Sequence, residues 1–205
     1  MDSKIIVFAG NVGAGKSTLA HAIGKQLGFE IFYESVADNP FLEDFYHDQR
    51  KWAYHLQSYF LVHRFSLIKE AEIGNKNAVF DRSIYEDAAI FARNLYETGK
   101  MRKKEFETYI QMFNSMMKYI RHPDLLVYID ADVDTILSRI RRRGRQMELE
   151  VPIAYWQQLD NLYKDWIKEY DFSPVYKIDA AKVDIVSNPD QINELTEDIR
   201  HILAL

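Results

Sequence analysis

Short apolar runs alternate with longer amphipathic stretches along this chain of 205 residues. Each run has the length and the continuous apolar character of a strand that is buried on both faces of a sheet. The runs predict five strands, over residues 4–9, 30–34, 78–81, 125–129 and 175–178. Strands that alternate with helices imply a parallel sheet with right-handed crossovers. The pattern therefore predicts an α/β fold with a five-stranded parallel sheet flanked by helices.

The stretches between these strands place apolar residues at helical spacing. They predict a short helix over 41–46 and longer helices over 17–27, 51–73, 87–97, 103–120, 132–143, 152–170 and 189–203. No repeat, low-complexity tract or linker interrupts the alternation of strands and helices in the sequence. We therefore expect a single domain that spans residues 1–205.

Two of the predicted helices carry more apolar surface than one buried face requires. The helix over 51–73 is apolar on more than one side, which indicates burial on two faces, by a central position or by a partner subunit. The helix over 103–120 carries an apolar stripe formed by Tyr109, Met112, Phe113, Met116 and Ile120. A stripe at this spacing indicates core or a subunit interface. Together the two helices favour a homodimer that associates through a helix bundle.

The segment between the first strand and the helix after it has the pattern Gly-x-x-x-x-Gly-Lys-Ser. Its glycines let backbone N–H groups converge on phosphate oxygens, and the helix N-terminus adds partial positive charge. We expect Lys16 to reach the β- and γ-phosphates and Ser17 to ligate Mg²⁺. A plain glycine-rich turn would need neither the strand before the loop nor the helix after it. The expected nucleoside-triphosphate site comprises Gly10, Asn11, Val12, Gly13, Ala14, Gly15, Lys16, Ser17 and Thr18.

Composition narrows the choice of partners and compartment. The net charge of −5 argues against a general nucleic-acid or anionic-membrane binder, because such binding needs a basic surface. The chain has no cysteine, which excludes disulfides and cysteine zinc sites and fits a reducing cytoplasm. The sequence shows no signal peptide, and its apolar runs are too short to span a membrane. We expect a cytoplasmic protein that binds neither nucleic acid nor membrane.

Two of the predicted strands end in a carboxylate, Glu34 after the second strand and Asp81 after the third. Ligands of open parallel sheets bind beyond the carboxyl ends of the strands, the edge that also carries the phosphate loop. Phosphoryl transfer needs a carboxylate to orient or deprotonate the attacking hydroxyl, another to hold Mg²⁺, and cations for the moving charge. Glu34 and Asp81 fit the two acidic roles, and Arg82 is the candidate cation.

Five arginines lie close together at the end of a predicted helix. Cations in the last turn suit the helix dipole, so a solvated basic face is one interpretation. The other is a mobile lid, over about residues 139–150, that folds over the phosphates. Arg139 and Arg143 are four residues apart and share a helix face, and Arg145 follows a glycine that can act as a hinge. We expect Arg139, Arg143 and Arg145 to serve the lid, and Arg141 and Arg142 to face solvent.

With these residues assembled, the sequence resembles the deoxynucleoside kinase family, in particular its bacterial deoxyadenosine/deoxycytidine kinases. The resemblance runs nearly from end to end, although Ser35 stands where many members have proline. It rests on residues 10–17, Glu34-Ser35-Val36, Tyr46, Trp52…Gln57…Arg64, Asp81-Arg82-Ser83-Ile84-Tyr85-Glu86-Asp87, and Arg139-x-x-x-Arg143-Gly144-Arg145-x-x-Glu148. The resemblance implies a P-loop kinase-type three-layer sandwich. It also implies transfer of the γ-phosphate of ATP to the 5′-hydroxyl of a deoxynucleoside, for nucleotide salvage.

The resemblance further implies roles for individual residues. Glu34 or Asp81 would accept the proton of the 5′-hydroxyl, and either could ligate Mg²⁺, so the identity of the base stays open. Arg82 would hold the 5′ oxygen or the phosphoryl group. Tyr46 and Glu148 would bind the sugar 3′-hydroxyl, with the Tyr46 ring crowding C2′ against a ribose hydroxyl. The implied substrate pocket comprises Glu34, Val36, Tyr46, Gln57, Arg64, Arg82, Asp87, Phe91 and Glu148.

The residue types in this pocket bear on base selection. The amide of Gln57 can pair with adenine and, when flipped, with other bases, so Gln57 alone is permissive. An ionised Asp87 only accepts hydrogen bonds, so it favours an exocyclic amino group over a carbonyl such as thymine O4. With Arg64 orienting Asp87, we expect deoxyadenosine and deoxycytidine in preference to thymidine, whereas guanine is harder to exclude. The alternative is a purely structural Arg64–Asp87 ion pair.

Other functions fit parts of the sequence. A deoxyguanosine kinase would share the same features. A nucleoside monophosphate kinase of similar fold would need extra cations for the phosphate of its acceptor. A regulatory NTPase is a further class, but guanine-specific switches use Asn-Lys-x-Asp, and here Asn75-Lys76-Asn77 is followed by Ala78.

Overall fold

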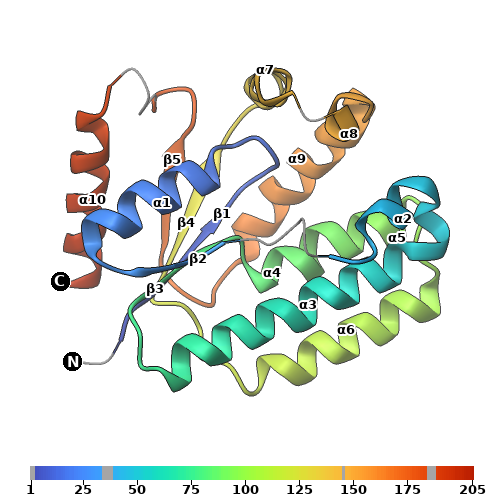
Figure 1. Ribbon diagram of the computed structural model, residues 1–205, viewed down its shortest axis with the longest axis horizontal. Helices are drawn as coiled ribbons and strands as arrows, with labels where there is room; N and C mark the ends of the chain where they lie inside the picture. Colours follow the sequence, from blue (N-terminus) through green and yellow to red (C-terminus); the bar gives the residue numbers. More distant parts are fainter. Residues whose placement is uncertain (1–2, 34–38, 145, 184–187) are drawn as a thin grey trace.

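The centre of the fold is a parallel sheet of five strands (Figure 1). The computed structural model describes residues 3–33, 39–144, 146–183 and 188–205. The strands are β1 (Ile5–Ala9), β2 (Glu30–Phe32), β3 (Ala78–Asp81), β4 (Leu125–Asp130) and β5 (Val175–Asp179). Their spatial order is β2-β3-β1-β4-β5, and every neighbouring pair is parallel. The fold class expected from the sequence is confirmed.

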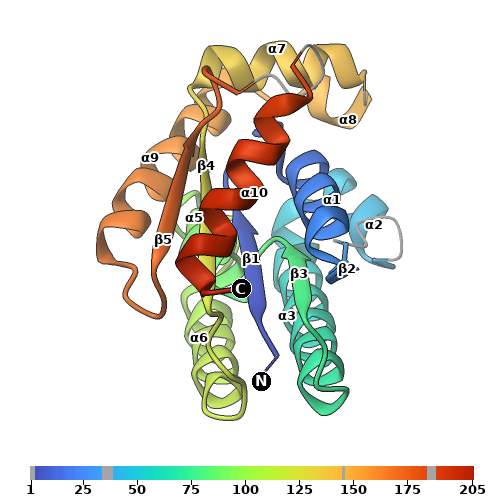
Figure 2. The same ribbon diagram turned by 90° about the vertical axis from the view of Figure 1, so that its left-hand side faces the viewer.

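Helices cover both faces of this sheet and complete a three-layer sandwich (Figures 1 and 2). On one face lie α1 (Lys16–Leu27) and α10 (Asp190–Leu203), which pack against each other. On the other side lie α3 (Gln49–Ile73), α6 (Lys103–Met117) and α9 (Ile153–Glu169). The remaining helices are α2 (Leu42–His47), α4 (Ile84–Glu86), the π-helical segment η1 (Asp87–Ala92), α5 (Arg93–Glu97), α7 (Val133–Arg143) and α8 (Gln146–Leu149).

Burial along the strands explains why their sequences are continuous apolar runs. The central strands β1 and β3 are buried over their whole length, whereas β5 at the edge of the sheet is mostly half-buried or exposed. Helix α1 approaches β2 so closely that a Cβ at Gly24 would stand 2.8 Å from Ile31. Because all neighbouring strands are parallel, their carboxyl ends lie at one edge of the sheet.

Several element boundaries differ from the sequence prediction, and one region differs in kind. The single helix expected over 87–97 is instead α4, η1 and α5 in succession. It begins earlier because Ser83 and Glu86 form a capping box, in which each side chain binds the backbone N–H of the other. It then widens into π-helix, which a 3.6-residue apolar period does not reveal. Helix α8 was not expected at all.

The two helices expected to be unusually apolar, α3 and α6, pack side by side (Figure 1). Tyr109 and Ile120 of the expected stripe are buried, but Met112, Phe113 and Met116 are only partly buried. On α3, Val62 is 50% exposed. The second apolar face of α3 is therefore not fully covered by the described part of the chain. No helix among the described residues has both the length and the apolar character that crossing a membrane requires.

Candidate active site

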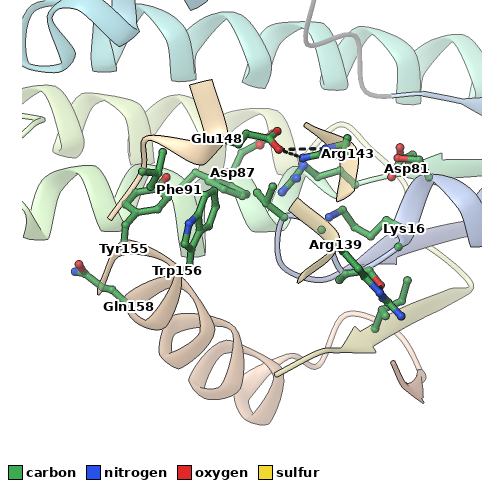
Figure 3. A pocket seen from close by; sticks show the side chains of 18 of the residues that line it. Lys16, Asp81, Asp87, Phe91, Arg139, Arg143, Glu148, Tyr155, Trp156 and Gln158 are labelled. Carbon is green, nitrogen blue, oxygen red and sulfur yellow. Dashed lines mark hydrogen bonds and ion pairs between the residues drawn. The ribbon is translucent and has the colours of Figure 1, made fainter. Parts of the chain in front are cut away.

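A cavity of about 1080 Å³ opens at the carboxyl edge of the sheet (Figure 3). In Figure 3, Lys16, Asp81 and Arg139 lie toward one end of it, and Phe91 and Tyr155 toward the other. The expected site residues that line it are Val12, Gly13, Ala14, Gly15, Lys16, Ser17, Thr18, Tyr46, Gln57, Arg64, Asp81, Arg82, Asp87, Phe91, Arg139, Arg143 and Glu148. Gly10 and Asn11 are buried and do not line it. Glu34, Val36 and Arg145 lie outside the described residues.

The phosphate loop joins β1 to α1 in a conformation that requires glycine. Gly10 has a φ of 147°, and a Cβ there would stand 2.7 Å from the carbonyl oxygen of Ile129. The Nζ atom of Lys16 donates to the carbonyl oxygens of Gly10 and Asn11, at 2.7 and 3.0 Å. The Asn11 side chain accepts from the N–H of Val12 at 2.8 Å and stabilises the loop from within. The loop thus presents its amides, its helix N-terminus and one lysine to the cavity.

Asp81 is the last residue of β3 and lies beside Phe8 of β1, directly next to the phosphate loop. It is buried, and its Oδ1 atom has no hydrogen-bond partner among the described residues. Leaving a buried polar atom unsatisfied costs about 1–3 kcal/mol, and more for a charged group. Asp81 therefore fits a ligand that brings a hydroxyl proton or a divalent cation to this edge of the sheet.

Arg82 follows Asp81 with a strained backbone. Its φ of 102° lies in a region that L side chains avoid at a cost of about 1–3 kcal/mol. Its N–H donates to the carbonyl oxygen of Phe8 at 3.0 Å, which fixes the turn against β1. The guanidinium is buried and lies 4.6 Å from the centre of the Phe91 ring. Its Nη1 atom donates to the hydroxyl of Tyr163 at 3.3 Å. The strain and these contacts hold a buried cation at the cavity wall.

Glu86 is a buried group at this turn to which the sequence prediction assigned no role. Its side chain is fully buried and accepts hydrogen bonds from the N–H of Gly10, the N–H of Ser83 and the hydroxyl of Tyr163. The sequence does carry a signal for it, because Ser-x-x-Glu before an apolar run is the capping-box pattern. That pattern indicates a helix start but not the contact with the phosphate loop. Tyr163 comes from α9, and no pattern in the sequence relates it to this turn.

At the far end of the cavity, Arg64 of α3 and Asp87 of η1 form a two-bonded ion pair. Arg64 Nη2 lies 3.0 Å from Asp87 Oδ1, and Nε binds Oδ2. Both residues are buried, and the structure confirms the pairing expected from the sequence. Gln57 lies seven residues before Arg64 on α3 and is also buried, and its Oε1 atom has no partner within the described part of the chain. The candidate ligand-binding groups at this end are thus side chains on separate helical elements.

Aromatic residues of α9 line the same end of the cavity. Tyr155 is partly buried, and loss of hydration raises its pKa to about 12, so its hydroxyl stays protonated at neutral pH. The second contribution to that pKa is the neighbouring Tyr46, which is 40% exposed. Trp156 is buried, and its Nε1 atom lacks a partner among the residues described. The sequence prediction missed both α9 residues, because an aromatic pair in an amphipathic helix is ordinarily core.

The basic segment at the end of α7 lies beside the phosphate loop. Arg139 donates to the carbonyl oxygens of Ala14 in the loop and Ala180 after β5, at 2.6 and 3.0 Å. Arg143 binds the carboxylate of Glu148, with Nε 3.1 Å from Oε2 (Figure 3). Glu148, expected at the sugar 3′-hydroxyl, is thus held by an arginine here. Arg142 is exposed, as expected, and it also lines the cavity.

Comparison with known proteins identifies the family. A family model described as deoxynucleoside kinase matches residues 6–204. A deoxyadenosine/deoxycytidine kinase of Bacillus subtilis is 40% identical over 203 residues, which cover 98% of this chain and 94% of that protein. The chain belongs to the deoxynucleoside kinase family. The resemblance noted in the sequence is confirmed, and the kinase is a phosphotransferase that phosphorylates nucleosides for salvage.

Two further relatives in this deoxynucleoside kinase family are named for different nucleosides. A deoxyguanosine kinase of Lactobacillus johnsonii is 41% identical over 204 residues, which cover 95% of this chain and 90% of that protein. A solved structure of a deoxyadenosine kinase from M. mycoides, with the products dCMP and a flexible dCDP bound, matches with a TM-score of 0.85 and 33% identity. That match covers 96% of this chain and 99% of the other. Family membership disfavours the monophosphate kinase and regulatory NTPase considered from the sequence.

Proposed function

We propose that this kinase phosphorylates the 5′-hydroxyl of deoxyadenosine, deoxycytidine or both, in preference to thymidine. The observation that carries the proposal is the buried Arg64–Asp87 pair at the end of the cavity away from the phosphate loop. Two bonds from Arg64 hold Asp87 as an acceptor-only group. Such a group pairs with the amino group of adenine or cytosine and leaves thymine O4 without a donor. The mismatch costs about 1–3 kcal/mol, or one to two decades in selectivity.

The phosphate end supports ATP as the donor and Mg²⁺ as its counterion. The loop amides and Lys16 would bind the triphosphate, and the Ser17 hydroxyl and the Asp81 carboxylate supply the oxygen ligands that Mg²⁺ prefers. When bound, Mg²⁺ neutralises charge on the phosphates. Among the described residues, no three His, Cys, Asp or Glu side chains gather as a possible metal site.

The reaction itself would use the carboxylates and arginines at the strand ends. Asp81, whose Oδ1 has no partner among the described residues, or Glu34 would take the proton from the 5′-hydroxyl, and either could ligate Mg²⁺. Arg82 would bind the 5′ oxygen or the moving phosphoryl group. Arg139, Arg143 and Arg145 would close over the phosphates as part of a lid at about residues 139–150.

The sugar would be bound by Tyr46 and Glu148. Both residues line the cavity, and the Tyr46 ring would crowd C2′ and reject a ribose hydroxyl. In the present arrangement Glu148 bonds to Arg143, so sugar binding would require a shift of this contact. If Glu148 exchanged Arg143 for the sugar hydroxyl, the position of the lid would depend on whether a nucleoside occupies the pocket.

A second candidate substrate is deoxyguanosine. A relative with 41% identity carries that name, and the Gln57 amide, with its Oε1 unpartnered within the described residues, can serve either edge of a base. The test is a panel of deoxyadenosine, deoxycytidine, deoxyguanosine and thymidine, each assayed for turnover with ATP and Mg²⁺. We expect deoxyadenosine or deoxycytidine to give the highest kcat/KM and thymidine the lowest. Thymidine as the preferred substrate would contradict the proposal.

The assembly is proposed to be a homodimer formed by α3 and α6. The support is the incompletely covered apolar surface of these helices, which includes Val62, Met112, Phe113 and Met116. Sedimentation at micromolar concentration should show a dimer, and a monomer alone would refute this assembly. A cytoplasmic location stays a prediction from composition.

A further inference from the structure

Glu86 joins three parts of the site that are far apart in the sequence. One oxygen, Oε1, accepts from the N–H of Gly10 at 3.1 Å and from the hydroxyl of Tyr163 at 2.7 Å. The other oxygen, Oε2, accepts from the N–H of Ser83 at 2.7 Å. The carboxylate therefore binds the first glycine of the phosphate loop, the turn after β3 and helix α9 at the same time.

Arg82 lies inside this network. Its Nη1 atom is 3.8 Å from Glu86 Oε1, which is an ion-pair contact but too long for a hydrogen bond. The same atom donates to the Tyr163 hydroxyl, which in turn donates to Glu86. A continuous chain thus runs from the Arg82 guanidinium through Tyr163 and Glu86 to the backbone of Gly10.

We propose that Glu86 is a positioning residue that sets the phosphate loop and the Arg82 guanidinium in one fixed relation. The two residues at the ends of this hydrogen-bonded network have unusual backbones, with φ of 147° at Gly10 and 102° at Arg82. Glu86 binds the phosphate loop at Gly10 and the turn next to Arg82 at Ser83. In-line transfer needs the donor phosphate and its stabilising cation aligned, and a misplacement of about 1 Å can cost on the order of 100-fold in rate. The inference rests on the proposed role of Arg82.

An amide cannot replace this carboxylate. All three hydrogen-bonding partners of Glu86 donate to it, two to one oxygen and one to the other. Glutamine has the same shape but only one acceptor oxygen, so its NH₂ group would face an N–H or O–H donor. Glu86→Gln therefore disturbs either the loop or the turn without leaving a cavity.

The decisive experiment compares Glu86→Gln with Asp124→Asn in steady-state turnover. Asp124 is a matched control, because its Oδ2 accepts the N–H of Ile5 at 2.8 Å, at the opposite end of the same strand β1. We expect Glu86→Gln to lower kcat by at least about tenfold while KM for both substrates changes less than about threefold. Asp124→Asn should leave kcat unchanged. A kcat for Glu86→Gln no lower than that of the control would overturn the inference.

A double-mutant cycle with Arg82→Lys tests whether Glu86 acts through Arg82. Positioning through Arg82 predicts that Glu86→Gln has a smaller effect on kcat when Arg82 is already replaced, and full additivity would overturn it. If Glu86→Gln does not fold, Tyr163→Phe decides: a fall in kcat supports the link and an unchanged kcat refutes it. If Arg82→Lys alone keeps wild-type kcat, the proposed role of Arg82 has failed, not only this inference.

Discussion

The two ends of the cavity are built from different parts of the protein. At the end beside the phosphate loop, the groups proposed to bind the ligand are mainly backbone amides of one continuous loop, shaped by glycines such as Gly10 with its φ of 147°. At the base end, they are side chains from separate elements, with Arg64 on α3, Asp87 on η1 and Trp156 on α9. Backbone groups bind what all nucleotides share, whereas side chains can distinguish one base from another.

This division predicts where substitutions act. Replacements at the phosphate end should affect turnover with every nucleoside equally, since each reaction uses the same donor. Replacements at the base end should change the ranking of nucleosides, and those at the buried Arg64–Asp87 pair should also lower the stability of the fold.

The largest effect is expected at Lys16, which bonds to the loop carbonyls of Gly10 and Asn11 and lines the cavity. Lys16→Ala should lower kcat/KM on the order of 10³-fold or more for every deoxynucleoside, because a preorganised cation at the phosphates is lost. Initial rates with ATP and each nucleoside measure this. Survival of wild-type turnover would contradict the assignment of the loop.

The next largest effect is on stability, at the buried Arg64–Asp87 pair. Arg64→Met should lower the free energy of unfolding by about 3–5 kcal/mol, because the buried carboxylate of Asp87 loses both bonds from its cationic partner. The matched control is Arg93→Met, which breaks the exposed pair with Glu97 and should cost at most about 1 kcal/mol. Urea unfolding of both variants gives the two values. Equal losses would show that the pair at the base end is not the buried one described.

A smaller effect is expected in the basic segment. Arg143→Ala removes a cation that lines the cavity and bonds to Glu148, and should lower kcat by about tenfold for all nucleosides alike. Arg141→Ala is the control, since Arg141 is exposed and does not line the cavity. An equal response of the two variants would favour the solvated basic face over the lid.

The smallest effect concerns Asp132, which caps α7 by accepting the N–H of Thr135 at 2.6 Å. This bond lowers the pKa of Asp132 from its ordinary value of 3.8. A lowered folded-state pKa means that the stabilisation is complete above pH 3.8 and is lost as the pH falls through the folded-state pKa. Asp132→Ala should cost about 0.5–2 kcal/mol at neutral pH. Thermal unfolding at several pH values should show the difference shrinking in acid, with kcat at neutral pH little changed.

The same division explains what could be predicted from the sequence. The phosphate loop is one contiguous segment, so its residues and its flanking strand and helix are readable together. Asp81 was predictable because parallel strands end at one edge of a sheet. The Arg64–Asp87 pair followed from the family resemblance, and its contact is now seen.

Other parts of the site were not predictable, for physical reasons. Glu86 looks like an ordinary helix cap in sequence, since nothing local shows that its carboxylate reaches Gly10. Tyr163 and Trp156 enter the site only through the packing of α9 against η1, which depends on tertiary contacts. The π-helical turn at Asp87–Ala92 departs from the period on which helix prediction relies.

Base selection by Asp87 is tested most directly by the ratio of kcat/KM for deoxyadenosine to that for thymidine, in the wild type and in Asp87→Asn. An asparagine amide can donate to thymine O4, which an ionised aspartate cannot. We predict that the wild-type ratio is about ten or more and falls by about one to two decades in the variant, with KM for ATP unchanged. A ratio that is unaltered by Asp87→Asn would contradict selection of the base by this carboxylate.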